Sequence, residues 1–146
     1  MQENIMLVVK RFISENKVLS EKALAIRHKV FVEEQGVDPV LEYDHDEEAH
    51  HYLLCMGKKT IATARWREVD GEIKLERFAV LPQFRSRGFG KVILLEVLID
   101  TLPLMKPIYL HSQVKAVRFY ERNGFVKEGE KFIEAGIEHY NMRYTG

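Results

Sequence analysis

The chain is poor in cysteine, lacks long apolar runs and carries no net charge, and each absence excludes a class of protein. Cys55 is the only cysteine among 146 residues, so an internal disulfide cannot form and a reducing compartment is expected. Apolar runs such as 92–95 are far shorter than the roughly 20 residues of a membrane span, and the N-terminus lacks the features of a signal peptide. We therefore expect a cytoplasmic protein without a membrane partner.

The charges balance, with 22 Lys and Arg residues against 22 Asp and Glu residues. Proteins that bind nucleic acid or anionic membranes depend on uncompensated basic charge, so neither partner is expected. Hydrophobic residues make up 46% of the chain, as in ordinary globular domains. No repeat, low-complexity tract or linker-like stretch interrupts the sequence, so we predict a single domain over residues 1–146.

Turn residues divide the chain into segments with strand-like or helix-like patterns. The segment 5–13 is β-rich, and the helix that follows is expected to have Ser20 as its N-cap and to end near Gly36. The later expected elements are strands at 51–56, 61–69 and 73–80, a helix from the loop 85–90 to Ile99, a strand at 108–110, a helix within 113–123, and strands at 125–132 and 138–144. Strands and helices alternate only in part, which predicts a mixed α+β fold with helices on both faces of the sheet.

The segment 81–91, LPQFRSRGFGK, joins an expected strand to an expected helix and carries the clearest functional signal. Gly88 and Gly90 leave the backbone open to a close ligand approach, and successive N–H groups at a helix N-terminus attract an anion. Arg85, Arg87 and Lys91 add formal positive charge. The segment therefore predicts a cradle for a phosphate or a pyrophosphate.

The spacing excludes two common phosphate cradles. A P-loop needs Gly and Ser or Thr where this chain has Arg85 and Val92. A dinucleotide-binding fingerprint needs a third glycine at the position of Ile93.

The Arg-x-x-Gly-x-Gly pattern, which follows the strand ending at 78–82, resembles the acetyl-CoA signature of the GNAT superfamily of N-acetyltransferases. A helix ending at 118–122 and the following Asn-Gly-Phe are similar to the family's Tyr-x-x-x-Gly-Phe run. The segments 27–35 and 132–139 resemble the ElaA/YjcF-like bacterial branch. The resemblance covers nearly the whole chain and implies the GNAT fold, a central, mostly antiparallel sheet splayed between its fourth and fifth strands.

The resemblance implies acetyl transfer from acetyl-CoA to a primary amine by direct transfer in a ternary complex, without a metal. The pantetheine arm would bond along one strand as an added strand, and backbone donors there would stabilise the oxyanion of a tetrahedral intermediate. Gln113 stands where many members carry Asn, and its side chain is one methylene longer. The implied cofactor-binding residues are Phe78, Ala79, Val80, Arg85, Ser86, Arg87, Gly88, Phe89, Gly90, Lys91 and Gln113.

The resemblance also implies catalytic roles. Tyr120 matches the tyrosine that would protonate the leaving thiolate, and the motif match favours this role over the alternative, aromatic packing beside Phe119 and Phe125. Two candidates for the general base stay open, Glu76 just before the cofactor strand and His139 in the last strand pair. An exposed strand carboxylate and a structural histidine are the respective alternatives.

Other residues receive plainer interpretations. Arg27 is a candidate for substrate binding, whereas Arg65 and Arg67 are expected on the solvent surface, opposite Trp66. The acidic stretch 44–48 has no zinc-site spacing; it is expected to be a solvated loop that attracts a cationic amine. Cys55, among apolar neighbours, is expected to be buried.

The sequence leaves the function open at one point. The alternative to an enzyme is a GNAT-like sensor or interaction module that binds acyl-CoA without turnover. The identity of the amine acceptor and the existence of a homodimer are likewise open.

Overall fold

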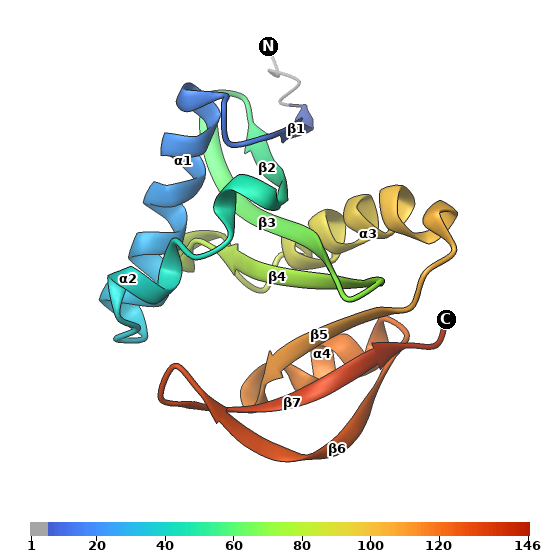
Figure 1. The fold of residues 1–146 in the computed structure, drawn as a ribbon. Helices are drawn as coiled ribbons and strands as arrows, with labels where there is room; N and C mark the ends of the chain where they lie inside the picture. Colours follow the sequence, from blue (N-terminus) through green and yellow to red (C-terminus); the bar gives the residue numbers. More distant parts are fainter. Residues whose placement is uncertain (1–5) are drawn as a thin grey trace.

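The predicted meander of three antiparallel strands forms the centre of the sheet (Figure 1), in a computed structural model that describes residues 6–146. The strands β2 and β3 and the strands β3 and β4 are hydrogen-bonded in antiparallel register. An N-terminal strand pairs with the outer edge of β2; position 5 of the predicted segment lies outside the described residues. The bounds are β1 Leu7–Phe12, β2 His50–Met56, β3 Lys59–Val69 and β4 Glu72–Val80.

The remaining strands extend this sheet to seven, in the order β1-β2-β3-β4-β5-β7-β6. They are β5 Ile108–Gln113, β6 Phe125–Glu134 and β7 Ile137–Tyr144. Every neighbouring pair is antiparallel except β4 and β5. The predicted mixed α+β fold and the predicted order of elements are therefore confirmed.

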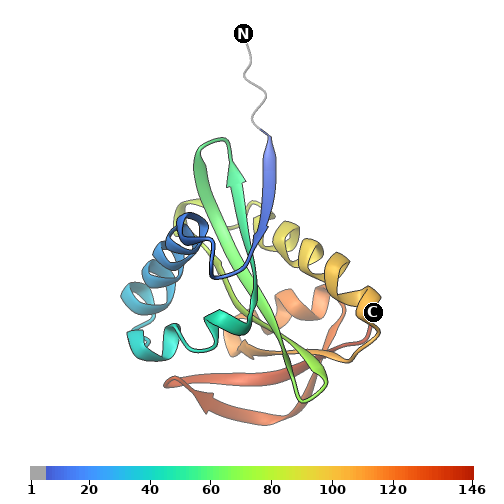
Figure 2. The ribbon, with the colours of Figure 1, turned by 45° about the horizontal axis from the view of Figure 1, so that its top comes forward.

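Helices cover both faces of the sheet because side chains alternate along its strands. Leu53 packs with α1 (Lys17–Arg27), whereas the next residue, Leu54, packs with α3 (Phe89–Thr101), and both leucines are fully buried. Figure 2 shows α1 in blue and α3 in gold on opposite sides of the strands. The short helix α4 (Val117–Arg122) joins the core on the α3 side.

The sheet splits between β4 and β5. Their parallel pairing covers only 73–75 against 108–110, after which β4 continues to Val80 and β5 continues beside β7 to the pair Gln113 and His139. In Figure 1 the two strands start side by side and diverge toward the left of the view. The predicted splay between the fourth and fifth strands is confirmed.

A bulge lies in β4 beside the split. Thr63 faces Ala79 and Arg65 faces Glu76, so two β4 residues stand opposite the one residue between Thr63 and Arg65. The first of the two, Arg77, has a φ of 56°, in the left-handed region that residues other than glycine seldom adopt. A bulge of this kind redirects side chains and backbone groups locally.

The first helix starts earlier than predicted. Asn16 is its N-cap, because the Asn16 Oδ1 accepts a hydrogen bond of 3.1 Å from the Leu19 N–H. Ser20 lies inside the helix, and its hydroxyl donates to the Ser14 carbonyl. The helix continues as the π-helical segment η1 (His28–Glu34), and Gly36 follows with a φ of 73°.

The other short elements connect this frame. They are α2 Pro39–Glu42, η2 Asp46–Glu48, η3 Pro82–Phe84, η4 Leu102–Leu104 and η5 Val114–Ala116. Within residues 6–146, no helix has the length and apolar character needed to cross a bilayer.

Candidate active site

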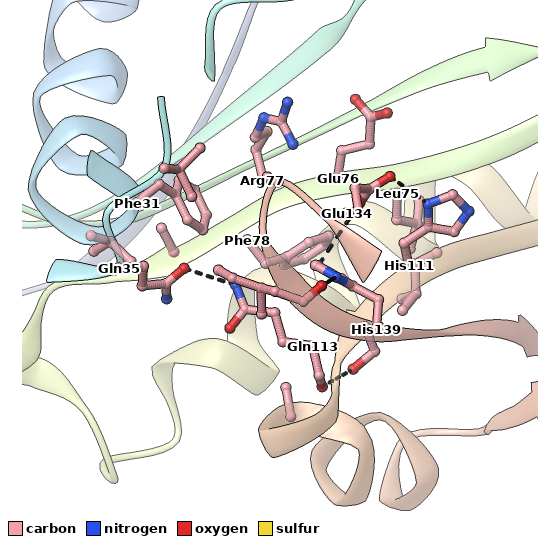
Figure 3. A pocket seen from close by; sticks show the side chains of 18 of the residues that line it. Phe31, Gln35, Leu75, Glu76, Arg77, Phe78, His111, Gln113, Glu134 and His139 are labelled. Carbon is pink, nitrogen blue, oxygen red and sulfur yellow. Dashed lines mark hydrogen bonds and ion pairs between the residues drawn. The ribbon is translucent and has the colours of Figure 1, made fainter. Parts of the chain in front are cut away.

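A cavity of about 770 Å³ lies where β4 and β5 separate. One wall is β4 from Lys74 to Val80, and the opposite wall comes from β5, β6 and β7. Phe31 and Gln35 approach from the segment at the end of η1, as Figure 3 shows. The split of the sheet thus brings residues from both halves of the chain into one site.

The predicted cofactor strand lines this cavity. Phe78, Ala79 and Val80 all contribute to the wall, and they lie beyond Leu75, where β4 pairs with β5 for the last time. Their backbone groups on that side have no strand partner in the described part of the chain. An extended ligand can therefore bond to this edge as a further strand.

The loop after β4 leads to an uncapped helix N-terminus. Gly88 precedes α3 with a φ of 84°, and no side chain in the described part of the chain caps the helix. The hydrogen bond from the Val92 N–H to the Gly88 carbonyl is 3.2 Å long, so the N–H groups of 89–91 precede the helical hydrogen-bonding pattern. These groups and the helix dipole favour an anion at this point.

The sequence predicts that the arginines of this loop bind a phosphate, but in the structure Arg85 and Arg87 already have partners within the protein. Arg85 donates to both carboxylate oxygens of Glu34, at 2.6 and 2.7 Å, and to the Val80 carbonyl. The Arg87 guanidinium lies 5.3 Å from the centre of the Phe89 ring. Arg85 and Gly90 line the cavity, whereas Ser86, Arg87, Gly88, Phe89 and Lys91 do not.

Gln113 joins the two halves of the site. Its Nε2 donates a hydrogen bond of 2.8 Å to the Gln35 Oε1 (Figure 3). Gln35 follows η1 and Gln113 ends β5, so this bond crosses from one side of the cavity to the other. The side-chain amide of Gln113 therefore already has a partner across the cavity.

Tyr120 lines the cavity from α4 and is only 8% exposed. Phe78, Phe119 and Phe125 surround its ring in edge-to-face contacts. Burial raises the pKa of the Tyr120 phenol above its usual value. A phenol carries its proton near neutral pH even at its ordinary pKa, so Tyr120 has a proton to donate.

Glu76 lines the cavity but is bound by three cations. Its carboxylate lies 2.6 Å from the Arg65 Nη2, 3.0 Å from the Arg67 Nε and 3.3 Å from the Lys74 Nζ. Burial opposes the ionisation of Glu76, but attraction to these cations outweighs it and lowers the pKa of Glu76 to about 2. A carboxylate that holds its charge so firmly is a weak proton acceptor, which argues against Glu76 as the general base.

His139 has an arrangement that suits a proton acceptor. Its Nδ1 lies 2.7 Å from the Ile137 carbonyl, and because a carbonyl only accepts, Nδ1 carries the hydrogen. In the neutral ring, Nε2 then has the free lone pair. The Glu134 Oε2 lies 3.8 Å from this Nε2 and can stabilise the ring after it gains a proton.

Two further residues of this cluster were missed at the sequence level. The His111 Nδ1 donates a hydrogen bond of 3.0 Å to the Glu134 Oε1, and this bond lowers the pKa of Glu134 below its ordinary value. Figure 3 shows Glu134 between His111 and His139. His111 lies two positions before Gln113, so strand alternation could have placed it on the same face, but the position of Glu134 depends on the β6–β7 pairing.

Arg27 is not positioned to bind a substrate. It is 2% exposed and does not line the cavity. Its guanidinium pairs with Glu42 and, at 2.8 Å, with Asp46. These buried ion pairs instead tie α1 to the segment before β2.

Arg65, Arg67 and Asp46 were expected on the solvent surface, and this prediction is wrong. Arg65 is 1% exposed, and its Nη1 lies 2.6 Å from the Asp46 Oδ1. Asp46 is half-buried and holds both Arg27 and Arg65, while Arg67 lines the cavity. The alternation of side chains along β3 correctly placed both arginines on the face opposite Trp66. That face is not open to solvent, because α1, α2 and the acidic loop 44–48 cover it.

Cys55 is buried beside α1, as predicted. It does not line the cavity.

Comparison with known proteins agrees with this geometry. The family described as "Acetyltransferase (GNAT) domain" matches residues 13–145. The Bacillus subtilis protein "Uncharacterized N-acetyltransferase YjcF" is 35% identical over 137 residues, which covers 92% of this chain and 98% of that protein.

Two crystal structures are similar over nearly their whole length. An acyl-CoA N-acyltransferase from Pseudomonas aeruginosa has a TM-score of 0.81 at 27% identity. Escherichia coli ElaA has a TM-score of 0.80 at 28% identity. Each comparison covers 96% of this chain and 100% of the other chain.

The environment of Glu76 predicts a specific loss of stability in acid. Its pKa is lower in the folded protein than the ordinary 4.5, so the unfolded chain takes up this proton first as the pH falls. The stabilisation is present above pH 4.5 and is lost between pH 4.5 and about 2; it is on the order of 3 kcal/mol. Urea unfolding of the wild type and of Glu76→Gln over this pH range measures it.

Glu76→Gln should be less stable than the wild type at pH 7, with a smaller loss of stability on acidification. Glu138→Gln is the control, because Glu138 is exposed and its ion-pair partner within residues 6–146 is the exposed Lys131. If the free energy of unfolding depended on pH equally in the wild type and in Glu76→Gln, the ion pairs of Glu76 would not be the source of the stabilisation.

Proposed function

The chain belongs to the acetyltransferase (GNAT) family, and we propose that it transfers an acetyl group from acetyl-CoA to a primary amine. The observation that carries this proposal is the cavity at the split of the sheet. An unpaired strand edge runs along it toward an uncapped helix N-terminus, and a proton donor and a proton acceptor face it.

The two backbone surfaces suit the two ends of the donor. The N–H groups of 89–91 would bind the pyrophosphate, since a helix N-terminus without a side-chain cap leaves them available. The free edge of β4 at 78–80 would bind the pantetheine arm. An N–H group of that edge would stabilise the oxyanion that forms at the thioester carbonyl.

We assign the general base to His139. The Nε2 of His139 would accept the proton that the amine loses as its nitrogen attacks the thioester carbon. The hydrogen bond from Nδ1 to the Ile137 carbonyl supports this assignment by fixing the tautomer. The nearby Glu134 would stabilise the resulting imidazolium.

We assign the general acid to Tyr120. As the carbon–sulfur bond breaks, the Tyr120 hydroxyl would donate its proton to the leaving sulfur, which releases the acetylated amine and CoA. Both residues then return to their starting protonation states by exchange with solvent. The burial of Cys55 away from the cavity supports direct transfer over an acyl-cysteine intermediate.

Binding of the donor and turnover can be tested separately. CoA at a hundredfold excess over its dissociation constant should stabilise the protein by about 2.7 kcal/mol, seen as a rise in the melting temperature. Lys91→Glu, which reverses a charge in the first turn of α3, should weaken CoA binding about tenfold or more. Lys22→Glu is the control, because Lys22 is exposed on α1.

The absence of any shift at millimolar CoA would overturn the proposed donor. Acetyl-CoA should release free thiol in the presence of a suitable amine. Binding of CoA without thiol release across a broad amine panel would instead identify a sensor that binds acyl-CoA without turnover.

Tyr120→Phe should lower kcat at least tenfold while leaving the KM for acetyl-CoA nearly unchanged. The phenylalanine keeps the ring and its aromatic contacts and removes only the proton donor. Steady-state kinetics measure the effect, with Tyr43→Phe as the control at an exposed tyrosine. An unchanged kcat would show that Tyr120 is not the acid.

His139→Gln should lower kcat/KM by about 100-fold and flatten the acid side of its pH profile. The amide cannot accept the proton of the amine at neutral pH. His28→Gln replaces an exposed histidine of η1 and should behave like the wild type. Retention of the wild-type pH profile in His139→Gln would assign the base elsewhere.

A further inference from the structure

We propose that the amine acceptor carries an anionic group, a carboxylate or a phosphate, which Arg67 and Arg77 bind in the cavity. This inference rests on the proposed acetyl transfer, because it specifies the substrate of that same site. Its basis is a charge imbalance in the cavity wall, together with hydrogen-bond donors that have no partner.

Ion pairs form one continuous network behind and along this wall. Each member contacts the next at salt-bridge distance, and the side chains are between 1% and 28% exposed. The cations are Arg27, Arg65, Arg67, Lys74 and Arg77, and the anions are Glu42, Asp46 and Glu76. Five positive charges against three negative charges leave two positive charges uncompensated.

Such an excess is costly away from bulk water, because buried charges are normally paired. Of the remaining carboxylates that line the cavity, Glu134 offsets part of the excess, because its charge interacts with that of Lys74. Glu134 accepts a hydrogen bond from His111, and Asp44 lies exposed and outside the network. An anionic ligand in the cavity would supply the missing negative charge.

The uncompensated charge lies at the cavity, where donors are available. All three guanidinium nitrogens of Arg65 have carboxylate partners. Arg67, in contrast, uses only its Nε, which donates to Glu76 at 3.0 Å. Its Nη1 and Nη2 have no partner within residues 6–146, and the residue lines the cavity.

Arg77 supplies further donors. Its Nη2 donates to the Leu41 carbonyl at 3.1 Å, but its buried Nε has no hydrogen-bond partner within the described chain. The nearest carboxylate oxygen, on Glu42, is 3.6 Å from that Nε. The planar fork of a guanidinium matches carboxylate and phosphate oxygens.

The bulge explains why Arg77 reaches the site. Consecutive residues of a regular strand point to opposite faces, yet the side chains of Glu76 and Arg77 both join the same ion-pair network. Figure 3 shows the two side chains extending to the same side of β4. The arrangement would hold an acceptor with its anionic group near Arg77 and its amine toward His139.

This inference reverses the expectation that the acidic loop attracts a cationic acceptor. Asp46 does not line the cavity and holds Arg27 and Arg65, and Glu48 pairs with His45. Two of the loop's carboxylates thus pair with the protein's own side chains, and Asp44 is the acidic residue of the loop that lines the cavity.

The anion site can be tested without knowing the acceptor. With CoA saturating its own site, inorganic phosphate and acetate are titrated at constant ionic strength while the melting temperature is recorded. At least one anion should raise the melting temperature of the wild type. Arg67→Gln and Arg77→Gln should each lose this rise, whereas Arg122→Gln, at an exposed arginine outside the cavity lining, should retain it.

A rise with phosphate alone would assign a phosphate ester, and a rise with acetate alone would assign a carboxylate. No rise in the wild type, or equal rises in all three variants, would overturn the anion site. CoA binding measured in the same samples reports on the proposed donor independently.

Turnover provides the second test. Matched amines with and without an anionic group, 4-aminobutanoate against butylamine and phosphoethanolamine against ethanolamine, are compared by thiol release. One anionic member should have a kcat/KM about tenfold higher or more, and this preference should shrink in Arg67→Gln and Arg77→Gln. Equal kcat/KM values within both pairs would overturn the anion site and leave the proposed acetyl transfer intact. Anion binding without any thiol release would instead refute acetyl transfer and leave the anion site intact.

Discussion

The separation of β4 from β5 after Leu75 and Leu110 is the constraint on which the site depends. A fully paired sheet would satisfy the backbone of 78–80 internally and leave no space between the strands. Because the strands part, that edge becomes available to a ligand, and the cavity opens beside it. The aromatic cluster around Tyr120 and the hydrogen bond between Gln35 and Gln113 border this opening.

Charge gives the cavity two different ends. Toward α3, backbone N–H groups at a helix N-terminus favour an anion without any formal charge. On the other wall, a network of guanidinium and carboxylate groups holds Glu76 ionised and leaves Arg67 and Arg77 with unused donors. Glu76 therefore holds three cations of this wall together. On the opposite wall, the Ile137 carbonyl accepts a hydrogen bond from the His139 Nδ1, which leaves the lone pair of Nε2 available.

Strong local patterns predicted most of the fold. Turn residues predicted the boundaries of β2, β3 and β4 to within a few residues. The glycine pattern located the start of α3 with similar accuracy. The helix cap at Asn16 was missed because several polar residues near the helix start can serve as N-caps. Among the site residues, the cofactor strand and Tyr120 were found at the cavity, but the burial of Arg27 and Arg65 was not anticipated.

The sequence by itself determined the order of elements, the helix N-terminus at 88–91 and the family, because these depend on residues close together in the chain. Tertiary structure alone decided which charges meet. Asp46 is 19 residues from both Arg27 and Arg65, and Glu134 reaches His111 and His139 only through the pairing of β5, β7 and β6. Alternation along a strand determines the side on which a residue points, whereas burial and ion pairing depend on what the rest of the chain places over that side.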